Sequence, residues 1–136
     1  MNIPWAIIGD FNALLFQPDR LSNNPITYGD VRNLAECVHD LLLSELNWKG
    51  NYYTLSNKQI GDGRVCCRQD RALCNTDWMS KWGHVVLEYD LPSISDHSPM
   101  VLSIYDTQRQ IKVPFRFFNV WSDQNEFIPI FTVLAK

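Results

Sequence analysis

The chain has 136 residues, of which 46% are hydrophobic and 20% charged, a composition that excludes a disordered segment and suits a single folded unit. Its formal net charge of -3 argues against a broad basic surface for nucleic acid, so any such contact must be local, metal-assisted or supplied by a missing part of the protein. The N-terminal stretch has no basic region, and Asp10 interrupts its apolar run. It therefore reads as neither a signal peptide nor a membrane span, and we expect an intracellular protein, nuclear or cytoplasmic and not secreted.

The four cysteines are expected to be structural. In a reducing compartment disulfides are not expected. Cys66 and Cys67 are adjacent in a strand-like stretch, so their side chains should point to opposite faces, and no C-x-x-C pair is present. We therefore favour buried cysteines over a zinc site for the whole set, which is Cys37, Cys66, Cys67 and Cys74.

The first third of the chain predicts a strand, a loop and a helix. Residues 5–8 form a short apolar run typical of a buried strand, and residues 9–12 form a turn. Residues 17–30 are rich in Pro, Asn, Ser and Gly, which predicts a surface loop. Asp30 is the expected cap of a helix. The apolar residues at helical spacing are Leu34, Val38, Leu41 and Leu42.

The middle of the chain predicts a hairpin. Residues 51–55 and 64–73 have strand-forming composition, and the Gly-Asp-Gly sequence at 61–63 provides the turn between them. A short helix is then expected to begin at Thr76. The tryptophans expected in the core are Trp5, Trp78 and Trp82.

The last part predicts two more strands and a tail. Residues 85–87 form one strand, residues 91–98 a loop, and residues 99–105 a half-buried strand. In the second strand the period-two apolar face consists of Met100, Leu102 and Ile104. Residues 1–106 are interpreted as one domain, and residues 107–136 as a linker-like tail.

This order of elements predicts an α/β (α+β) fold in which the helix packs on one face of a sheet. No segment of the chain offers an obvious second layer for the other face. This is one indication that the chain is incomplete.

Two turns that follow apolar strands carry groups suited to phosphate chemistry. Asp10 supplies a carboxylate that suits Mg²⁺ or the orientation of a water, and Asn12 supplies an amide donor for a phosphoryl oxygen. Their spacing on an extended segment would aim both side chains the same way. Asp96 and His97 place a carboxylate beside an imidazole, a ligand and a cation or general base. Both turns also fit plain polar loops with Asx turns.

Asp70 allows two interpretations. It stands between arginines in a strand-like stretch, so it fits a salt-bridged structural acid. Alternatively, Asp70 accepts the Nδ1–H of His97 and fixes the tautomer of that ring. The basic residues considered for contact with DNA, although solvated surface charges are the simpler interpretation, are Arg68, Arg71 and Lys81.

Four segments together carry a resemblance to a known family. They are residues 5–12, 53–57, 68–75 and 95–99, and their order and spacing resemble the endonuclease/exonuclease/phosphatase superfamily. Residues 115–121 resemble the segment that follows this domain in plant LINE-type (non-LTR) retrotransposons. The resemblance implies the C-terminal half of a four-layered sandwich in which two sheets pack face to face between helices. Since this chain could supply only about one of those sheets, the resemblance also implies a large exposed apolar patch that is prone to association.

The resemblance also implies roles for individual residues. Asp10 would position or deprotonate the attacking water, and Asn12 would hold the scissile phosphate. Asp96, with Asp10, would serve a Mg²⁺ or Mn²⁺ centre. His97 would contact the phosphate and stabilise developing charge, with Asp70 orienting it. The implied reaction is in-line hydrolysis of a phosphodiester in DNA.

The chain departs from the family pattern in two ways. Gln69 stands where an apolar residue is usual, and Leu55 where these relatives usually have Trp. The family's first half supplies an Asn and a Glu to the metal, and nothing before Trp5 can do so. We therefore expect an incomplete fold with little or no nuclease activity alone, which would pair with a missing N-terminal half or self-associate. The alternatives are a catalytically inactive remnant that acts as an interaction module, and a phosphatase of small substrates.

Overall fold

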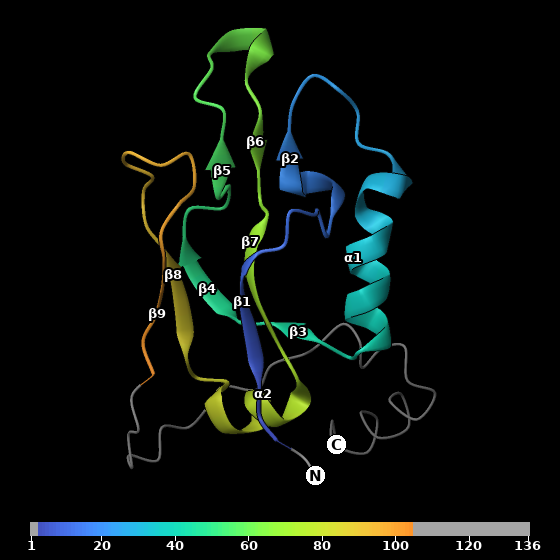
Figure 1. The fold of residues 1–136 in the computed structure, drawn as a ribbon, viewed down its shortest axis with the longest axis vertical. Coiled ribbons are helices and arrows are strands. Elements are labelled where there is room, and N and C mark those ends of the chain that lie inside the picture. The colour runs from blue at the N-terminus through green and yellow to red at the C-terminus, as the bar shows by residue number, and fades with distance from the viewer. Residues whose placement is uncertain (1–2, 105–136) are drawn as a thin grey trace, which may run out of the picture.

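The computed structural model describes residues 3–104, which form a mixed α/β fold with two α-helices and three small sheets (Figure 1). The helices are α1 (Tyr28–Asp40) and α2 (Thr76–Trp82), with 3-10 turns η1 (Gln17–Asp19) and η2 (Gly61–Gly63). The strands are β1 (Ala6–Asp10), β2 (Arg20–Leu21), β3 (Ser44–Glu45), β4 (Asn47–Gly50), β5 (Leu55–Ser56), β6 (Cys66–Cys67), β7 (Asp70–Cys74), β8 (Val86–Tyr89) and β9 (Met100–Leu102). The expected α+β class is therefore confirmed at this level.

The three sheets are joined by strands that run on from one to the next. The orders are β1-β7-β3, β4-β8-β9 and β2-β6-β5. Only Leu46 separates β3 from β4, and its N–H donates to the carbonyl of Ala72 in β7 at 2.9 Å, so the first two sheets meet there. Likewise β6 leads into β7 after two residues, which carries the chain from the upper hairpin into the central sheet (Figure 1).

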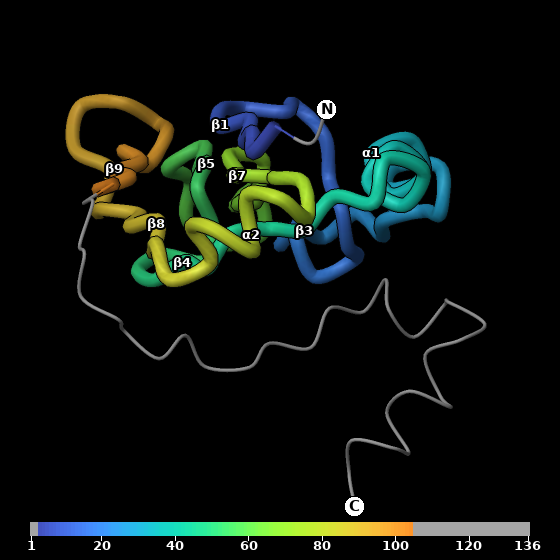
Figure 2. Tube along the Cα trace, turned by 90° about the horizontal axis from the view of Figure 1, so that it is seen from below, coloured from blue at the N-terminus to red at the C-terminus, as the bar shows by residue number. Residues whose placement is uncertain are grey.

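Strand β7 is the centre of this arrangement. It pairs antiparallel with β1 on one side and with β3 on the other, and all five of its residues are buried. Viewed from below, β7 lies between β1 and α2, with α1 off to one side (Figure 2). Leu73 and Cys74 are therefore paired on both sides, whereas Asp70, at the other end of β7, pairs with Asp10 of β1.

Apolar clusters fix the helices against the sheet. Leu34 of α1 packs in a cluster with Leu73 of β7, together with Leu15 and Leu43. A second cluster gathers Ala72 and Cys74 of β7 with residues of β8, and Trp78 of α2 packs against it. Burial of this kind contributes about 25 cal/mol per Å² of apolar area, so these clusters supply most of the stability of a domain this small.

The first helix differs from the sequence prediction at both ends. Its N-cap is Thr27, and Asp30 lies at the third position, where its carboxylate accepts from the Thr27 N–H at 2.7 Å and from the Thr27 hydroxyl at 2.8 Å. This contact lowers the pKa of Asp30. Leu41 and Leu42 lie beyond the last helical residue and are exposed. The buried residues of the helix are Val31 and Leu34, and the helix ends at Asp40, two residues before the last leucine of the expected apolar spacing.

The remaining elements largely match their predictions. The hairpin exists but is short, since only β5 and β6 pair and Tyr52 and Tyr53 lie outside any strand. Helix α2 is capped by Asn75, whose side chain accepts from the Trp78 N–H. Residues 17–21, expected to be loop, contain η1 and β2. Met100 and Leu102 pack on the core as the period-two pattern predicted, but Ile104 is 48% exposed.

Glycine is required at Gly50, where β4 ends beside β8. Its φ is +98°, and a Cβ there would lie 2.1 Å from the Tyr89 carbonyl oxygen. Parallel pairing brings the two backbones together at this point, so a side chain cannot be accommodated. This close approach fixes the position of Tyr89, which the site uses.

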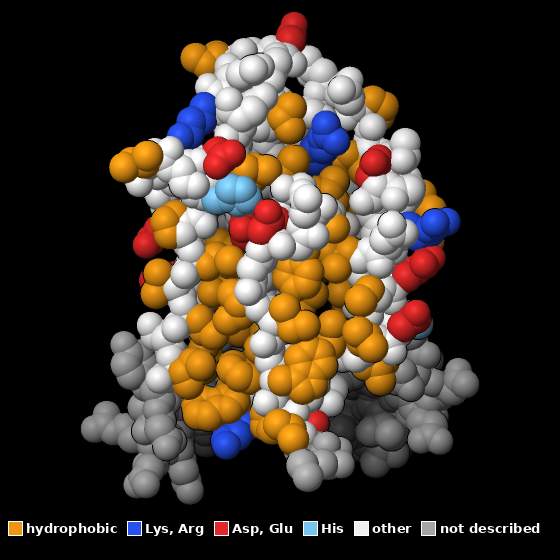
Figure 3. All heavy atoms as spheres, viewed as in Figure 1, with side chains coloured by type: hydrophobic (Ala, Val, Ile, Leu, Met, Phe, Trp, Pro, Cys, Tyr) orange, Lys and Arg blue, Asp and Glu red, His pale blue; other side chains and the backbone are white. Residues whose placement is uncertain are grey.

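A broad hydrophobic surface covers β1 and the strands beside it (Figure 3). Ile7 and Ile8 of β1 are 50% and 42% exposed. Trp5 is also exposed, so its assignment to the core was wrong, whereas Trp78 packs on the core as expected. The exposure of a large apolar face, predicted from the lack of a second layer, is thus confirmed.

The cysteines follow the structural interpretation with one exception. Cys66, Cys67 and Cys74 are buried and carry no disulfide, but Cys37 on α1 is exposed. Burial raises the pKa of the Cys67 thiol, which keeps it protonated. Among residues 3–104, no helix is long and apolar enough to cross a membrane. The tail at 107–136 lies outside the described residues.

Candidate functional site

Strand pairing places two carboxylates side by side. Asp10 ends β1, Asp70 begins β7, and the two are direct partners in the antiparallel register. The N–H of Phe11 donates to the Gln69 carbonyl, and the N–H of Asn75 donates to the Trp5 carbonyl. By alternation, Asp10 and Asp70 then form a non-hydrogen-bonded pair, the kind whose side chains approach most closely. Like charges directly opposed are destabilising, so this position calls for a compensating cation.

His97 meets this pair from a different part of the chain. It lies in the loop between β8 and β9, and a single bridge to Leu55 of β5 holds the loop against the hairpin. Its Nδ1 lies 3.0 Å from Oδ2 and 3.2 Å from Oδ1 of Asp70. An ionised carboxylate only accepts, so Nδ1 carries the proton and Nε2 is left facing away from Asp70. The predicted contact between Asp70 and His97 is therefore confirmed, while its role in a reaction stays a prediction.

The three groups form one cluster. One ligand atom from each of Asp10, Asp70 and His97 can be chosen such that all lie within 4.8 Å of one another. Asp10 is exposed, His97 is half-buried, and Asp70 is buried at 4% exposure. Within residues 3–104 this is the group of acidic, His and Cys side chains that is close enough to hold a metal ion.

The charge environment favours the imidazolium form of His97. Its hydrogen bond to Asp70 raises the pKa of His97 above the ordinary 6.5, with further contributions from the negative charges of Asp10 and Asp96, while burial opposes them. His97 therefore stays positively charged to higher pH than a free histidine. A positive imidazolium beside two carboxylates supplies part of the compensation that the Asp10–Asp70 pair requires.

Asn12 lies next to the cluster but not as the sequence predicted. The extended segment ends at Asp10, and Asn12 adopts a φ of +49°. Its N–H donates to Oδ1 of Asp10 at 2.7 Å, which closes an Asx turn. The assumption that both side chains leave an extended strand in the same direction was wrong, because the chain turns between them. The exposed Asn12 amide remains available to a ligand at the rim.

Asp96 occupies the rim as well. Its side chain is exposed, and its backbone carbonyl accepts from the N–H of Ser56 at 3.1 Å. It is not a member of the cluster formed by Asp10, Asp70 and His97. Its charge acts on His97, as stated above. Of the predicted site residues, the structure thus gathers three in contact distance and leaves Asn12 and Asp96 beside them.

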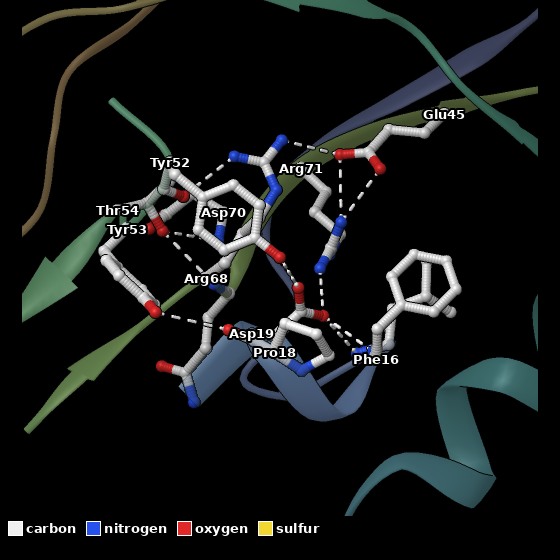
Figure 4. A network of polar contacts seen from close by, with 12 residues as sticks. Phe16, Pro18, Asp19, Glu45, Tyr52, Tyr53, Thr54, Arg68, Asp70 and Arg71 are labelled. Atoms are coloured by element: carbon white, nitrogen blue, oxygen red, sulfur yellow. Dashed lines mark hydrogen bonds and ion pairs between the residues drawn. The ribbon is translucent and has the colours of Figure 1, made fainter. Parts of the chain in front are cut away.

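The arginines around Asp70 do not pair with it. Arg71 binds Glu45 through Nη1, at 3.0 Å and 2.9 Å, and Asp19 through Nη2. Arg68 donates to Glu45 at 2.7 Å. Figure 4 shows these contacts. Both arginine side chains are 1% exposed, so neither Arg68 nor Arg71 is a surface contact for DNA. Asp70 is ion-paired, as one interpretation expected, but its partner is His97 and not an arginine, because Arg68 and Arg71 pair with Glu45 and Asp19.

Aromatic rings complete the surroundings of Arg68. Its guanidinium carbon lies 4.1 Å from the ring centre of Trp48 and 4.8 Å from that of Tyr89. Asp19 is fully buried, and its other oxygen accepts from the Tyr52 hydroxyl at 2.8 Å. Burial and this hydrogen bond raise the pKa of Tyr52 to about 12. This cluster of Asp19, Glu45, Arg68 and Arg71, here called the ion network, stabilises the strand that carries Asp70.

Sequence reasoning missed two residues that hold the Asp70 backbone. The Tyr89 hydroxyl donates to the Asp70 carbonyl at 2.9 Å, and the Thr54 hydroxyl accepts from the Asp70 N–H at 3.1 Å. Thr54 is 1% exposed and Tyr89 is 3% exposed. No local signal marks either residue, because each looks like an ordinary strand or loop position. Their contacts span 16 and 19 residues, a separation that only the tertiary structure reveals.

The donor set fits a hard divalent cation. Mg²⁺ is commonly held in proteins by one or two carboxylates, with waters and substrate phosphate completing its shell. Asp10 offers an exposed carboxylate, whereas the imidazolium form of His97, bonded to Asp70 through Nδ1, has no lone pair left for an ion. Asp70 is already engaged through the His97 ring. The residues present therefore fit an ion held mainly through Asp10, with oxygens from solvent or substrate.

Comparisons of this chain with protein-family models, with curated proteins and with solved structures found no match.

Proposed function

We propose that this site binds a divalent cation and hydrolyses a phosphodiester in DNA, and that Asp10, Asp70 and His97 carry the reaction. The observation that supports it is the apposition of Asp10 and Asp70 in register, with His97 bonded to the second. Two opposed carboxylates that keep an exposed edge are costly unless a cation lies between or beside them. A structural role alone would favour burial and pairing with opposite charges, as in the ion network, where each carboxylate meets an arginine.

The mixed α/β fold is compatible with a more specific proposal about the architecture of the complete enzyme. The sequence resemblance implies the C-terminal half of an endonuclease/exonuclease/phosphatase sandwich. In such a sandwich the exposed apolar face over β1 would be covered by a second sheet. The site would then lie at one end of the interface between the sheets. Another polypeptide or a second copy of this chain is the proposed partner on that face.

Each group has a distinct task in the proposed reaction. Asp10, exposed at the end of β1, accepts a hydrogen bond from the attacking water and orients it. His97, kept protonated by Asp70, donates from Nε2 to a phosphate oxygen and opposes the charge that develops there. Asn12 holds a second phosphate oxygen at the rim. A bound Mg²⁺ or Mn²⁺, with Asp10 as its main ligand and Asp96 nearby, would supply Lewis-acid stabilisation of that charge.

Turnover by the isolated chain is expected to be weak. The cluster offers three ligand groups, and one of them, Asp70, is already bonded to His97. Mg²⁺ prefers six ligands in near-octahedral geometry. The negative net charge of the chain adds no general attraction for DNA. The assay must therefore detect slow cleavage at high enzyme concentration.

The test is nicking of supercoiled plasmid under single-turnover conditions with Mg²⁺, and separately with Mn²⁺. The wild-type chain is compared with Asp10→Ala and His97→Ala. The matched control is His39→Ala, since His39 and Asp40 form an exposed pair at 3.3 Å on α1, away from the site. We expect slow nicking that needs the cation, is lost in both site variants and is kept in the control.

Two outcomes would count against the proposal. Nicking that persists in Asp10→Ala would mean that the cleavage comes from another source. A folded wild-type chain that gives no nicks with either cation would favour an inactive interaction module instead. Cleavage of small phosphate esters but not of plasmid would move the proposal to a phosphatase.

A further inference from the structure

Thr54 makes contacts with both segments that meet in the site. It lies just before β5 and is 1% exposed. Its hydroxyl oxygen accepts from the N–H of Gln69 at 3.2 Å and from the N–H of Asp70 at 3.1 Å. Its carbonyl accepts from the N–H of Ser98 at 2.7 Å. One buried residue is therefore bonded to the strand that carries Asp70 and to the loop that carries His97.

The backbone around Thr54 leaves it little freedom. Its own N–H donates to the Cys67 carbonyl at 2.9 Å, so both of its backbone polar groups are engaged. The next residue, Leu55, bridges to His97. Figure 4 shows the Thr54 side chain directed toward the backbone next to Asp70, on the side of the strand away from Arg71. The hydroxyl is thus held at a fixed point between the two segments.

The Thr54 hydroxyl provides hydrogen bonds that strand pairing does not provide at this point of the chain. The bend between β6 and β7 falls at Arg68 and Gln69, where the chain leaves one sheet for the next. The N–H groups of Gln69 and Asp70 are in or beside this bend, and Thr54 is their acceptor. Without it, the first residue of β7 would lose a buried partner at the point where its carboxylate must face His97.

We infer that Thr54 is a positioning residue that holds Asp70 and His97 in register through its hydroxyl and its carbonyl. The inference rests on the proposed function for its biological meaning, but its geometry can be tested without metal, DNA or turnover. It also makes a specific claim about chemistry. When Thr54 holds the pair, neutral His97 is fixed as the Nδ1–H tautomer by Asp70.

The test reads the tautomer of His97 directly. Ring ¹⁵N chemical shifts of the metal-free, full-length chain are recorded at a pH where the histidines are neutral. The variants are Thr54→Val, which keeps the shape and removes the acceptor, and Thr54→Ser, which restores the hydroxyl. Thr76→Val is the matched control, because Thr76 is exposed at the start of α2. His84 serves as the reference within each spectrum.

The wild type, Thr54→Ser and Thr76→Val are expected to show His97 mainly as the Nδ1–H form. Thr54→Val should lose that preference and give a mixture of the two neutral tautomers. Its nicking rate, if the wild type cleaves, should fall by about 10- to 100-fold, as is typical when a group that orients a site residue is removed. A His97 tautomer unchanged in Thr54→Val would overturn the inference.

A second variant and a second measurement keep the inference testable if Thr54→Val does not fold. Thr54→Cys keeps a side chain of similar size with a much weaker acceptor, and the same tautomer loss is expected there. In the wild type, the amide protons of Gln69 and Asp70 should exchange slowly with solvent. Fast exchange at both amides in the folded chain would also overturn the inference. Absence of nicking in the wild type bears on the proposed function and leaves these results standing.

Discussion

The ion network and the Asp10–Asp70–His97 site are built around the same strand segment, but they differ in burial and in the pairing of their charges. In the network, Asp19, Arg68 and Arg71 are at most 1% exposed, and the charges oppose and neutralise one another. In the site, Asp10 is exposed and faces another carboxylate. In the ion network each charge is paired with an opposite charge, whereas in the site the carboxylate of Asp10 stays available to a ligand. This contrast separates a stabilising cluster from a reactive one.

The largest expected effect comes from breaking the network. Arg71→Met leaves the buried carboxylate of Asp19 without its cation, so we expect a loss of about 3–5 kcal/mol in the free energy of unfolding. Urea denaturation measures it. Arg32→Met is the control, since Arg32 meets Glu36 at 3.9 Å on the surface and should cost less than about 1 kcal/mol. Equal losses in the two variants would contradict a buried, coupled network.

A double variant sharpens this result. Asp19→Asn combined with Arg71→Met removes both members of the pair. The loss should be smaller than the sum of the two single losses, because the double variant no longer strands a buried charge. The interaction energy from the double-mutant cycle should exceed about 1 kcal/mol. Additive losses would mean that Arg71 stabilises the fold through packing alone.

The next effect distinguishes Asp70 from its arginine neighbours. Asp70→Asn keeps the shape and removes the charge, so the pKa of His97 should fall back toward its ordinary value, since the hydrogen bond to Asp70 is its main cause. The loss of stability should stay below about 1 kcal/mol, because His97 is partly solvated. Proton NMR titration of His97 checks the shift. A His97 pKa that moves more in Arg71→Met than in Asp70→Asn would contradict the orienting role of Asp70.

The Asp70–His97 pair also determines whether the stability contributed by His97 rises or falls with pH. The pKa of His97 is raised in the folded state, so its contribution to stability is complete below the unfolded value near 6.5 and is lost as pH rises through the folded value. The stability difference between wild type and His97→Gln should therefore shrink as pH increases above 6.5. The comparison is made by urea denaturation at several pH values. A difference that grows with pH would mean that His97 is destabilised in its charged form.

The smallest effect on stability is expected at Asp10. Asp10→Asn retains an oxygen that accepts from the Asn12 N–H, so the turn is kept and the change should stay within about 0.5 kcal/mol. It also relieves the opposition to Asp70. Thermal unfolding gives the comparison. A large loss would place Asp10 among the structural residues of the fold and remove the contrast between the two regions.

The sequence predicted those parts of the molecule that depend on local pattern. The strand before Asp10, the helix after the loop, the short hairpin and the second helix all follow from apolar spacing and turn residues. The contact between Asp70 and His97 was also predicted, since a carboxylate and an imidazole near the ends of strands are natural partners. The elements follow from local spacing, whereas the Asp70–His97 contact spans 27 residues and was predicted from the chemistry of the two side chains.

Other features depend on tertiary pairing and could not be predicted. Arg68 and Arg71 were interpreted as surface charges because no local sequence pattern shows that Asp19 and Glu45 lie beside them in the fold. Asn12 looked extended because a positive φ leaves no mark on the sequence around it. Thr54 and Tyr89 acquire their contacts with Asp70 only when the hairpin and β8 are packed beside β7. The C-terminal end of α1 was predicted too late because Leu41 and Leu42, which follow the helix, continue its apolar spacing.

The measurement that tests the central claim most directly is paramagnetic broadening by Mn²⁺ in the ¹H–¹⁵N spectrum of the folded chain, for wild type and Asp10→Asn. We predict that low concentrations of Mn²⁺ broaden the amides around Asp10 and His97 first, and that Asp10→Asn removes this effect without altering the rest of the spectrum. Broadening centred elsewhere, or equal broadening near His97 in the variant, would contradict a cation site built on the apposition of Asp10 and Asp70.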